Sequence, residues 1–433
     1  MNYNIKDILA SMSNIDGWQV KEERTRASEL FFIKRDVDMN RSKDVHHIYV
    51  TVYKSFEEDG KKYMGSSKTT LAPTMTNEEV VQILDDAAYA SSFVKNEYYP
   101  IVKPTNESKV QLTSSMDQKP IEQWLPEMTQ CVYECHELVD QALNSAELFV
   151  DEINTRLFNS EGVDEQYKHY KIFLEFITNW KGEKEEVELY KSIKCSDYSP
   201  ELIKTAVKDM IDLAVEKSKA EPMRTLKEMS VLLTGGAVRQ FMLYYADKSN
   251  SKMIYEKVSD FEIGKSVQGN EIKGDRLSLM LDPALPNSTF AAPVDEDGVV
   301  LRKTDVIKDG ILNQYWGGHR YAHYLDIEAT GLNRNFVVES GSKTIEEMKA
   351  DSYIELVEFS DFYVDSITGD FAGEIRLAHY YDGNSVKPFT LGAISGNIKD
   401  VQEEMYFSKE KQQINNYHGP KMLQFFNGSI TGN

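Results

Sequence analysis

The chain of 433 residues is poor in cysteine and has no long apolar run. Three cysteines are too few for a disulfide framework, and no second pair follows Cys131 and Cys135 at the spacing of a zinc site. No apolar stretch approaches the ~20 residues that cross a bilayer. The N-terminal segment also lacks the basic and apolar regions of a secretory signal. We therefore expect a reduced protein without a membrane partner, located in the cytoplasm.

Positive charge is scarce as well, because 49 Lys+Arg stand against 70 Asp+Glu and give a formal net charge of −21. No block of Lys or Arg is longer than two residues. Binding to nucleic acid requires a clustered positive surface, so the sequence argues against DNA or RNA as a direct partner. The 41% hydrophobic residues, with 24 Tyr and 19 Phe, are sufficient for large hydrophobic cores.

Glycine is scarce in the first half of the chain, where only five of the 24 glycines precede residue 235. Glycine permits positive-φ turns and bulges, so the second half is predicted to consist of strands and turns. The sequence thus predicts an α+β fold in three parts. These are an N-terminal α+β segment (1–100), a central helix, meander and helix segment (101–222), and a larger strand-rich, glycine-rich C-terminal domain (223–433).

Apolar periodicity predicts the elements of the first segment. Residues 47–53 alternate as in a strand, and a turn at 58–60 leads to another strand from Lys62. Thr76 and Glu79 form a capping-box pattern, which predicts the start of a helix.

The central segment begins with a connector, because residues 96–121 contain three prolines and few periodic apolar positions. A helix is expected from Pro126, with its apolar face continuing to Leu143. A three-stranded meander with turns at 159–162 and 181–183 is expected next. Ser199 should then cap another helix.

The common catalytic motifs of phosphate-binding, dinucleotide-binding, nucleophile-elbow and H-E-x-x-H zinc proteins are absent. On a helix, His319 and His323 would project from one face, as two metal ligands do, but no Glu lies between them and no third ligand is evident. A solvated or hydrogen-bonded role is favoured for this pair. The acidic segment 295–298 has its glycine at the fourth position, where an EF-hand requires the sixth, and is interpreted as a turn.

An ordered series of segments in the C-terminal half is more informative than any single motif. The series consists of Val231–Val238, which enters a helix, then Val294–Val300, Val306–Leu312, Ala329–Gly331 and Asp365–Phe371. It resembles the TldD/PmbA family (peptidase U62), whose members carry a D-x-[ED]-G-V turn, an I-x-x-G-x-L strand, a T-G-N-type turn and a "tGdF" hairpin in that order. The resemblance extends over most of the chain.

The resemblance implies a choice between two kinds of subunit. TldD-like subunits carry an H-E-x-x-x-H helix with two metal-binding His, and a Cys far downstream as a further ligand; TldE/PmbA-like subunits lack them and pair with a TldD-like partner. Aligning residues 237–238 with the family's A-V places Gly235 and Gly236 at the first His and the Glu. Gln240 then stands at the second His, and His418 lies near the Cys position. One imidazole and one amide do not hold a transition metal, so the chain resembles the metal-free type and is expected to carry no cofactor.

The expected function is that of a non-catalytic subunit in a metallopeptidase complex that acts on unfolded peptides, with a metal, expected to be zinc, in the partner. The positions expected to bind substrate are Gly235, Gly236, Arg239, Gln240 and His418. The guanidinium of Arg239 is suited to a substrate carboxylate, and an extended peptide can add to a strand edge. A purely structural role for these positions stays open.

Two alternatives come from other functional classes. One is a regulatory protein-binding module without peptidase activity, which the family's label "modulator of DNA gyrase" suggests. The other is a self-sufficient hydrolase that uses His319 and His323, and this alternative is the least favoured. Whether the chain alone forms a homodimer is left open by the sequence.

Overall fold

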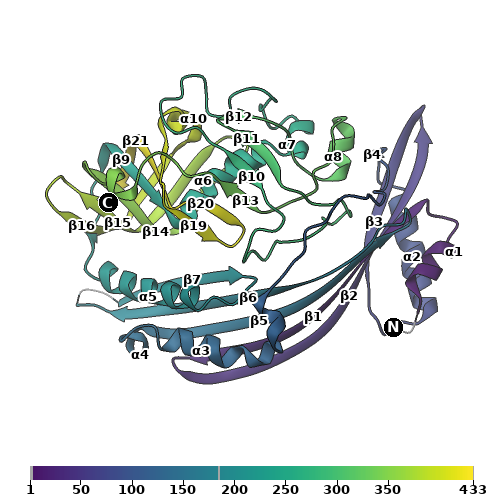
Figure 1. Cartoon of the computed structure of the whole chain (residues 1–433), viewed down its shortest axis with the longest axis horizontal. Coiled ribbons are helices and arrows are strands. Elements are labelled where there is room, and N and C mark those ends of the chain that lie inside the picture. Colours follow the sequence, from purple (N-terminus) through teal and green to yellow (C-terminus); the bar gives the residue numbers. More distant parts are fainter. Residues whose placement is uncertain (1–2, 184–185, 433) are drawn as a thin grey trace.

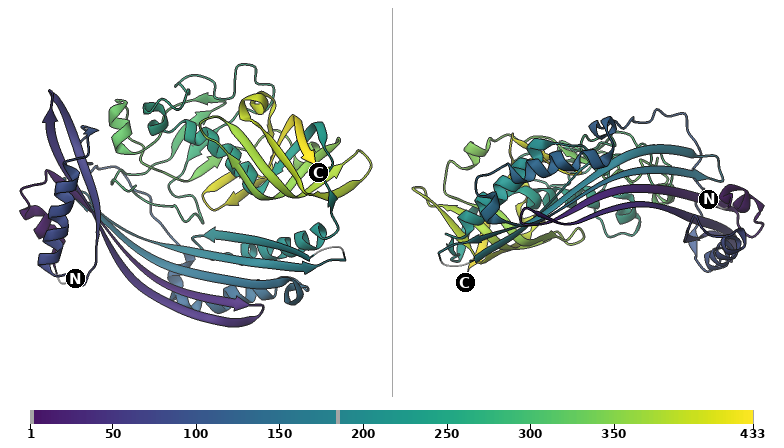
Figure 2. Two further views of the ribbon diagram at one scale, coloured as in Figure 1. Left: turned by 180° about the vertical axis from the view of Figure 1, so that it is seen from behind. Right: turned by 90° about the horizontal axis from the view of Figure 1, so that it is seen from below.

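The computed structural model describes residues 3–183 and 186–432. A long, curved N-terminal sheet lies beneath a C-terminal part that contains two further sheets in the view of Figure 1. Figure 2 shows the curvature of the N-terminal sheet from behind and from below. The α+β class and the strand-rich C-terminal part that the sequence predicts are both confirmed.

Seven strands form the N-terminal sheet, in the order β4-β3-β2-β1-β5-β6-β7. They are β1 (Gly17–Ile33), β2 (Asp36–Glu58), β3 (Lys61–Leu71), β4 (Asn96–Glu97), β5 (Leu143–Asn159), β6 (Asp164–Lys181) and β7 (Glu186–Cys195). All neighbouring strands are antiparallel. Since β1 pairs with β5 from Gln19 to Ile33, the sheet is continuous across the expected division at residue 100. The first two segments therefore share one sheet, and the connector between them runs from β4 to the helices before β5.

Helices cover one face of this sheet at its two ends. They are α1 (Ile5–Ser11) and α2 (Asn77–Ser91) at one end, and η1 (Ser115–Gln118), η2 (Ile121–Gln123), α3 (Leu125–Tyr133), α4 (Val139–Ala142) and α5 (Pro200–Lys217) toward the other. Phe158 packs with the first group and Val150 with the second. Both are even-numbered residues of β5, so the two cores lie on the same face. From Ser145 onward, beyond a register shift after Leu143, the odd-numbered residues of β5 face the opposite side.

The predicted starts of two helices are confirmed. Thr76 and Glu79 form both hydrogen bonds of a capping box at α2, and Ser199 Oγ accepts the amide of Leu202 at α5. The meander and its turns are also as predicted.

The continuous helix expected between Pro126 and Leu143 is wrong. Helix α3 ends at Tyr133, and a turn in which His136 Nδ1 accepts the amide of Leu138 leads to the short α4. Leu143 already begins β5. The apolar periodicity persists across the turn because Val132 and Val139 are buried in the same core. The sequence pattern therefore does not reveal where α3 ends.

The C-terminal part contains a six-stranded and an eight-stranded sheet. The six-stranded order is β12-β11-β10-β13-β20-β19, with β10 (Leu279–Leu281), β11 (Thr304–Lys308), β12 (Ile311–Leu312), β13 (Phe336–Val338), β19 (Lys411–Ile414) and β20 (Tyr417–Pro420). The other order is β14-β9-β21-β17-β15-β16-β8, with β18 on β21. Its strands are β8 (Glu221–Pro222), β9 (Leu226–Thr234), β14 (Tyr353–Val364), β15 (Asp370–Tyr381), β16 (Val386–Thr390), β17 (Gly392–Asn397), β18 (Tyr406–Phe407) and β21 (Met422–Gly432). Because β14 also pairs with β15, five of these strands close into a ring.

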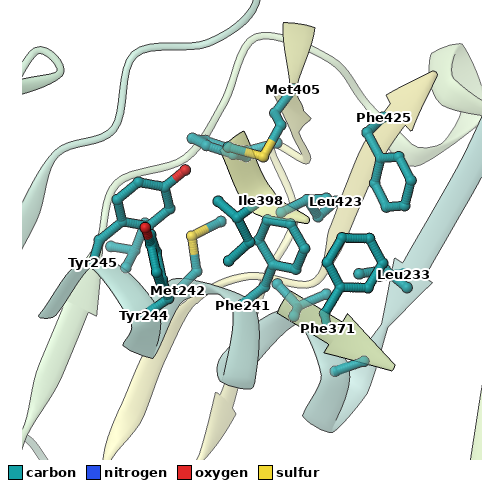
Figure 3. Packing of buried hydrophobic residues seen from close by; sticks show 14 of the residues in the cluster. Leu233, Phe241, Met242, Tyr244, Tyr245, Phe371, Ile398, Met405, Leu423 and Phe425 are labelled. Carbon is teal, nitrogen blue, oxygen red and sulfur yellow. The ribbon is translucent and has the colours of Figure 1, made fainter. Parts of the chain in front are cut away.

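Helix α6 (Gly235–Lys248) is the buried helix of this part. The remaining helices are α7 (Ser251–Tyr255), α8 (His319–Tyr324), α9 (Ile345–Met348), α10 (Ile398–Val401) and η3 (Gln402–Glu404). Figure 3 shows Phe241 of α6 against Phe371 and Phe425, with ring centroids 5.5 Å and 6.3 Å away. This packing on strands β15 and β21 fixes the position of α6.

Two expectations from composition can be compared with the structure. All three cysteines are free, and Cys131 and Cys195 are buried. In the described part of the chain, no helix is long and apolar enough to span a membrane.

Candidate functional site

The start of α6, where the resemblance places the replaced motif, borders open space. Strand β9 leads directly into it, and Thr234 Oγ1 donates to the carbonyl of Leu356 (3.0 Å) instead of capping the helix. A β-carbon added at Gly235 or Gly236 would meet no atom within 4 Å. The first helical amides therefore lack a side-chain cap and lie at an accessible surface.

Arg239 lies one helical turn further along and is largely buried. Its Nε and Nη2 donate to Asn416 Oδ1 at 3.3 and 3.0 Å. Burial lowers the pKa of Arg239, and the more distant Asp247 carboxylate opposes this effect. Within the described residues, no carboxylate lies in ion-pair distance of this guanidinium. Because the only side-chain partner of Arg239 among the described residues is the neutral amide of Asn416, its guanidinium retains N–H donors for an anion.

The hairpin of β19 and β20 lies against α6. Gln412 Nε2 donates to the carbonyl of Gly235 (3.1 Å), and Asn416 Nδ2 donates to the carbonyl of Arg334 (2.5 Å). His418 is half-buried in β20, opposite Val337 on one side. Burial and the nearby Lys411 lower the pKa of its imidazole.

The structure thus brings two of the five predicted positions, Gly235 and Arg239, into contact with the hairpin that carries a third, His418. The side chains of Gln240 and His418 make no hydrogen bond to other site residues in the part of the chain that the structure describes. Gln412 and Asn416, which make the actual contacts, were missed by sequence reasoning. No local signal could have identified them, since each lies 177 residues from its partner in α6.

The residues at this position do not fit a metal. Two glycines offer no side-chain donor, and Gln240 and His418 supply one amide and one imidazole, whereas transition metals require several deprotonated N, O or S ligands. Over residues 3–183 and 186–432, no three His, Cys, Asp or Glu side chains form a group that could hold a metal ion.

One member of the predicted histidine pair, His319 and His323, contacts the backbone of a distant segment. His319 and His323 both lie in α8, and the Nε2 of His319 is 2.9 Å from the carbonyl oxygen of Pro100. Burial lowers the pKa of His319. Its ring therefore links α8 to the connector after β4.

The acidic segment 295–298 forms the predicted turn. The carboxylate of Asp295 is buried and accepts the amides of Asp297, Val299 and Leu332, each at 2.9 Å. Its oxygens are occupied by backbone amides, as in a turn in which an Asp side chain caps its own loop.

Residues 226–428 match the family model for the PmbA/TldA metallopeptidase C-terminal domain. An uncharacterized protein of Methanocaldococcus jannaschii is 24% identical over 183 residues, which span 40% of this chain and 43% of that protein. Metalloprotease PmbA of Escherichia coli O157:H7 is 29% identical over 138 residues, which span 31% of each chain. The matched segments thus span less than half of either relative.

Solved structures match nearly the whole chain. TldE from Thermococcus kodakarensis has a TM-score of 0.78 at 16% identity, covering 99% of this chain and 100% of that one. A proposed modulator of a DNA gyrase from Thermotoga maritima has a TM-score of 0.76 at 15% identity, covering 96% of each chain. A similar protein from Bacteroides thetaiotaomicron gives 0.76 at 16% identity, covering 99% of each. At these identities the likeness shows the fold.

The fold and the matched domain are those of proteins of the PmbA/TldD type. Residues 226–428 thus carry the C-terminal domain of the PmbA/TldD family.

Proposed function

We propose that the chain is a TldE/PmbA-like, non-catalytic subunit of a cytoplasmic metallopeptidase complex that degrades or processes unfolded peptides. A TldD-like partner supplies the metal, expected to be zinc. One observation carries this proposal: the start of α6 has Gly235, Gly236 and Gln240 at the positions of the family's H-E-x-x-x-H motif, and open space in place of side-chain donors.

The role proposed for this chain is to hold substrate beside the partner's metal. Strand β19 is an edge strand of its sheet, and its Gln412 contacts the carbonyl of Gly235. An extended peptide added to this edge would form main-chain hydrogen bonds with little sequence selectivity. The guanidinium of Arg239 would then pair with a carboxylate of the peptide.

The proposal is tested by mixing the purified chain with an H-E-x-x-x-H-bearing relative and following cleavage of an unfolded fluorogenic peptide. Cleavage is expected only in the mixture. Arg239→Gln is expected to reduce it by roughly tenfold or more, the cost of losing a charge-assisted hydrogen bond. Arg276→Gln, at an exposed position, is the matched control and should leave the rate unchanged. Stoichiometric zinc in the isolated chain, or cleavage by it alone, would overturn the proposal.

The names of two structural neighbours favour a second candidate, a regulatory protein-binding module without peptidase activity. The same mixture separates the two functions. Stable binding of the chain to DNA gyrase, with no peptide cleavage in the presence of the relative, would favour the regulatory module.

A further inference from the structure

A cavity of about 190 Å³ lies between the N-terminal sheet and loops of the C-terminal part. One wall consists of odd-numbered side chains of β1, β5 and β6, which point away from the helix-covered face: Lys21, Glu23, Thr155, Leu157, Tyr167, His169 and Lys171. The other wall comes from the loops 289–296 and 332–334, with Leu301. The cavity therefore exists only where the two parts of the molecule meet, and it has both polar and apolar walls.

His169 lines this cavity, and its ring stacks on that of Tyr167 with centroids 5.7 Å apart. Its Nδ1 is buried and forms no hydrogen bond to the described part of the protein. Burial lowers the pKa of His169 to about 4, and the charge of Lys171 adds to this effect. The ring is therefore neutral at physiological pH and can carry its proton on Nδ1. A buried donor left unpaired is unfavourable, so a ligand that accepts its hydrogen bond would gain stability there.

The carboxylates that line the cavity already have partners. Glu23 lies 2.8 Å from Lys21, and Glu296 lies 3.4 Å from Arg334. Asp295 accepts two backbone amides of its own turn and the amide of Leu332. A cation would find no free carboxylate among these groups.

Lys171 supplies a positive charge at the cavity. It is exposed at the cavity, two residues after His169 on the same face of β6, and its ammonium has no carboxylate within ion-pair distance among the described residues. An ammonium and a neutral imidazole N–H side by side form a donor pair that matches the two oxygens of a carboxylate.

The cavity is connected to the candidate site at α6. The carbonyl of Arg334, in the cavity wall, accepts from Asn416, whose other amide atom accepts from Arg239. Thr289, also in the wall, donates its amide to Asn415 at 2.9 Å. The same β19–β20 turn thus borders both the cavity and Arg239.

We propose that this cavity binds the side-chain carboxylate of an acidic residue in the peptide substrate, held by Lys171 and His169. The inference deepens the proposed function, on which it rests for the identity of the ligand as a peptide. It names a substrate class, namely unfolded peptides with an Asp or Glu, and a selectivity that strand addition alone cannot provide. The apolar side chains of Leu157, Leu301 and Leu332 in the cavity walls would pack on the methylene groups of that residue.

The test uses two fluorescein-labelled, blocked, unfolded peptides that are identical except for one central Glu or Gln. Fluorescence anisotropy with the full chain is expected to show about tenfold tighter binding of the Glu peptide, a typical value for one charge-assisted contact. Lys171→Gln should abolish this preference. Lys168→Gln, on the same strand with its side chain on the opposite face, is the matched control and should retain it. Equal binding of the two peptides by wild type, or a preference that survives Lys171→Gln, would overturn the inference and leave the proposed function intact.

A second measurement observes the cavity directly. The full chain is labelled with ¹⁵N-histidine, and the ring resonances of His169 are assigned by comparison with His169→Gln. N-acetyl-glutamate methylamide is expected to shift these resonances. The matching glutamine derivative is expected to leave them unchanged. If neither peptide binds but this shift occurs, the carboxylate site stands and the proposed function fails. If His169 responds to neither derivative, the inference is wrong.

Discussion

At the scale of single residues, His379 carries a charge that joins α5 to the C-terminal sheet. Its Nε2 lies 2.8 Å from Glu216 of α5, and its Nδ1 lies 3.1 Å from Glu355 of β14. These two carboxylates raise the pKa of His379 from 6.5 to about 9. Because the pKa is higher in the folded state, the stabilisation is complete below pH 6.5 and is lost as the pH rises through about 9. We expect the free energy of unfolding to fall over this range and His379→Gln to reduce that fall.

Urea unfolding below pH 6.5 and near pH 9 measures this effect, with an expected difference on the order of 1–2 kcal/mol after solvent screening. His47→Gln removes an exposed histidine and should retain the wild-type pH dependence. An unchanged dependence in His379→Gln would mean that these ion pairs do not stabilise the fold.

At the scale of elements, the start of α6 contains two glycines with opposite conformational requirements. Gly235 has a φ of +57°, whereas Gly236 is not among the positive-φ residues. Gly235→Ala should therefore destabilise the protein by roughly 1–2 kcal/mol, and Gly236→Ala should stabilise it by up to about 1 kcal/mol. Neither change produces a clash, because no atom lies within 4 Å of the added carbon. Thermal unfolding of the two variants checks this, and shifts of the same sign would contradict it.

At the scale of the whole molecule, the connector after β4 attaches the C-terminal part to the end of the sheet. Tyr324 of α8 donates its hydroxyl to the carbonyl of Glu97 (2.6 Å), and His319 contacts Pro100. Tyr324→Phe removes the first of these contacts without changing the packing of the ring. We expect faster amide hydrogen exchange in the connector near Glu97 and unchanged exchange in α6. Tyr363→Phe, at an exposed ring of β14, is the control. If amide exchange near Glu97 is the same in Tyr324→Phe as in Tyr363→Phe, this contact does not hold the connector.

Local signals predicted much of the fold. The capping box at Thr76, the cap at Ser199 and the turn at 295–298 depend on interactions within a few residues, which a sequence displays directly. The prediction that the helix continues beyond Tyr133 was wrong, because two short helices packed on one core give the same apolar periodicity as one long helix. The apolar pattern records which residues are buried, but it does not record where the backbone turns between them.

The sequence by itself determined the α+β class, the strand-rich second half and the resemblance to the TldD/PmbA family, because composition, periodicity and motif order are local properties of the chain. The tertiary structure alone decided that β1 pairs with β5 across the connector and that Asn416 is the partner of Arg239. It also decided that His169 lines a cavity, where its Nδ1 has no hydrogen-bond partner among the described residues. These features join residues far apart in sequence. Strand pairing and packing create them, and no short-range pattern encodes which distant residues will meet.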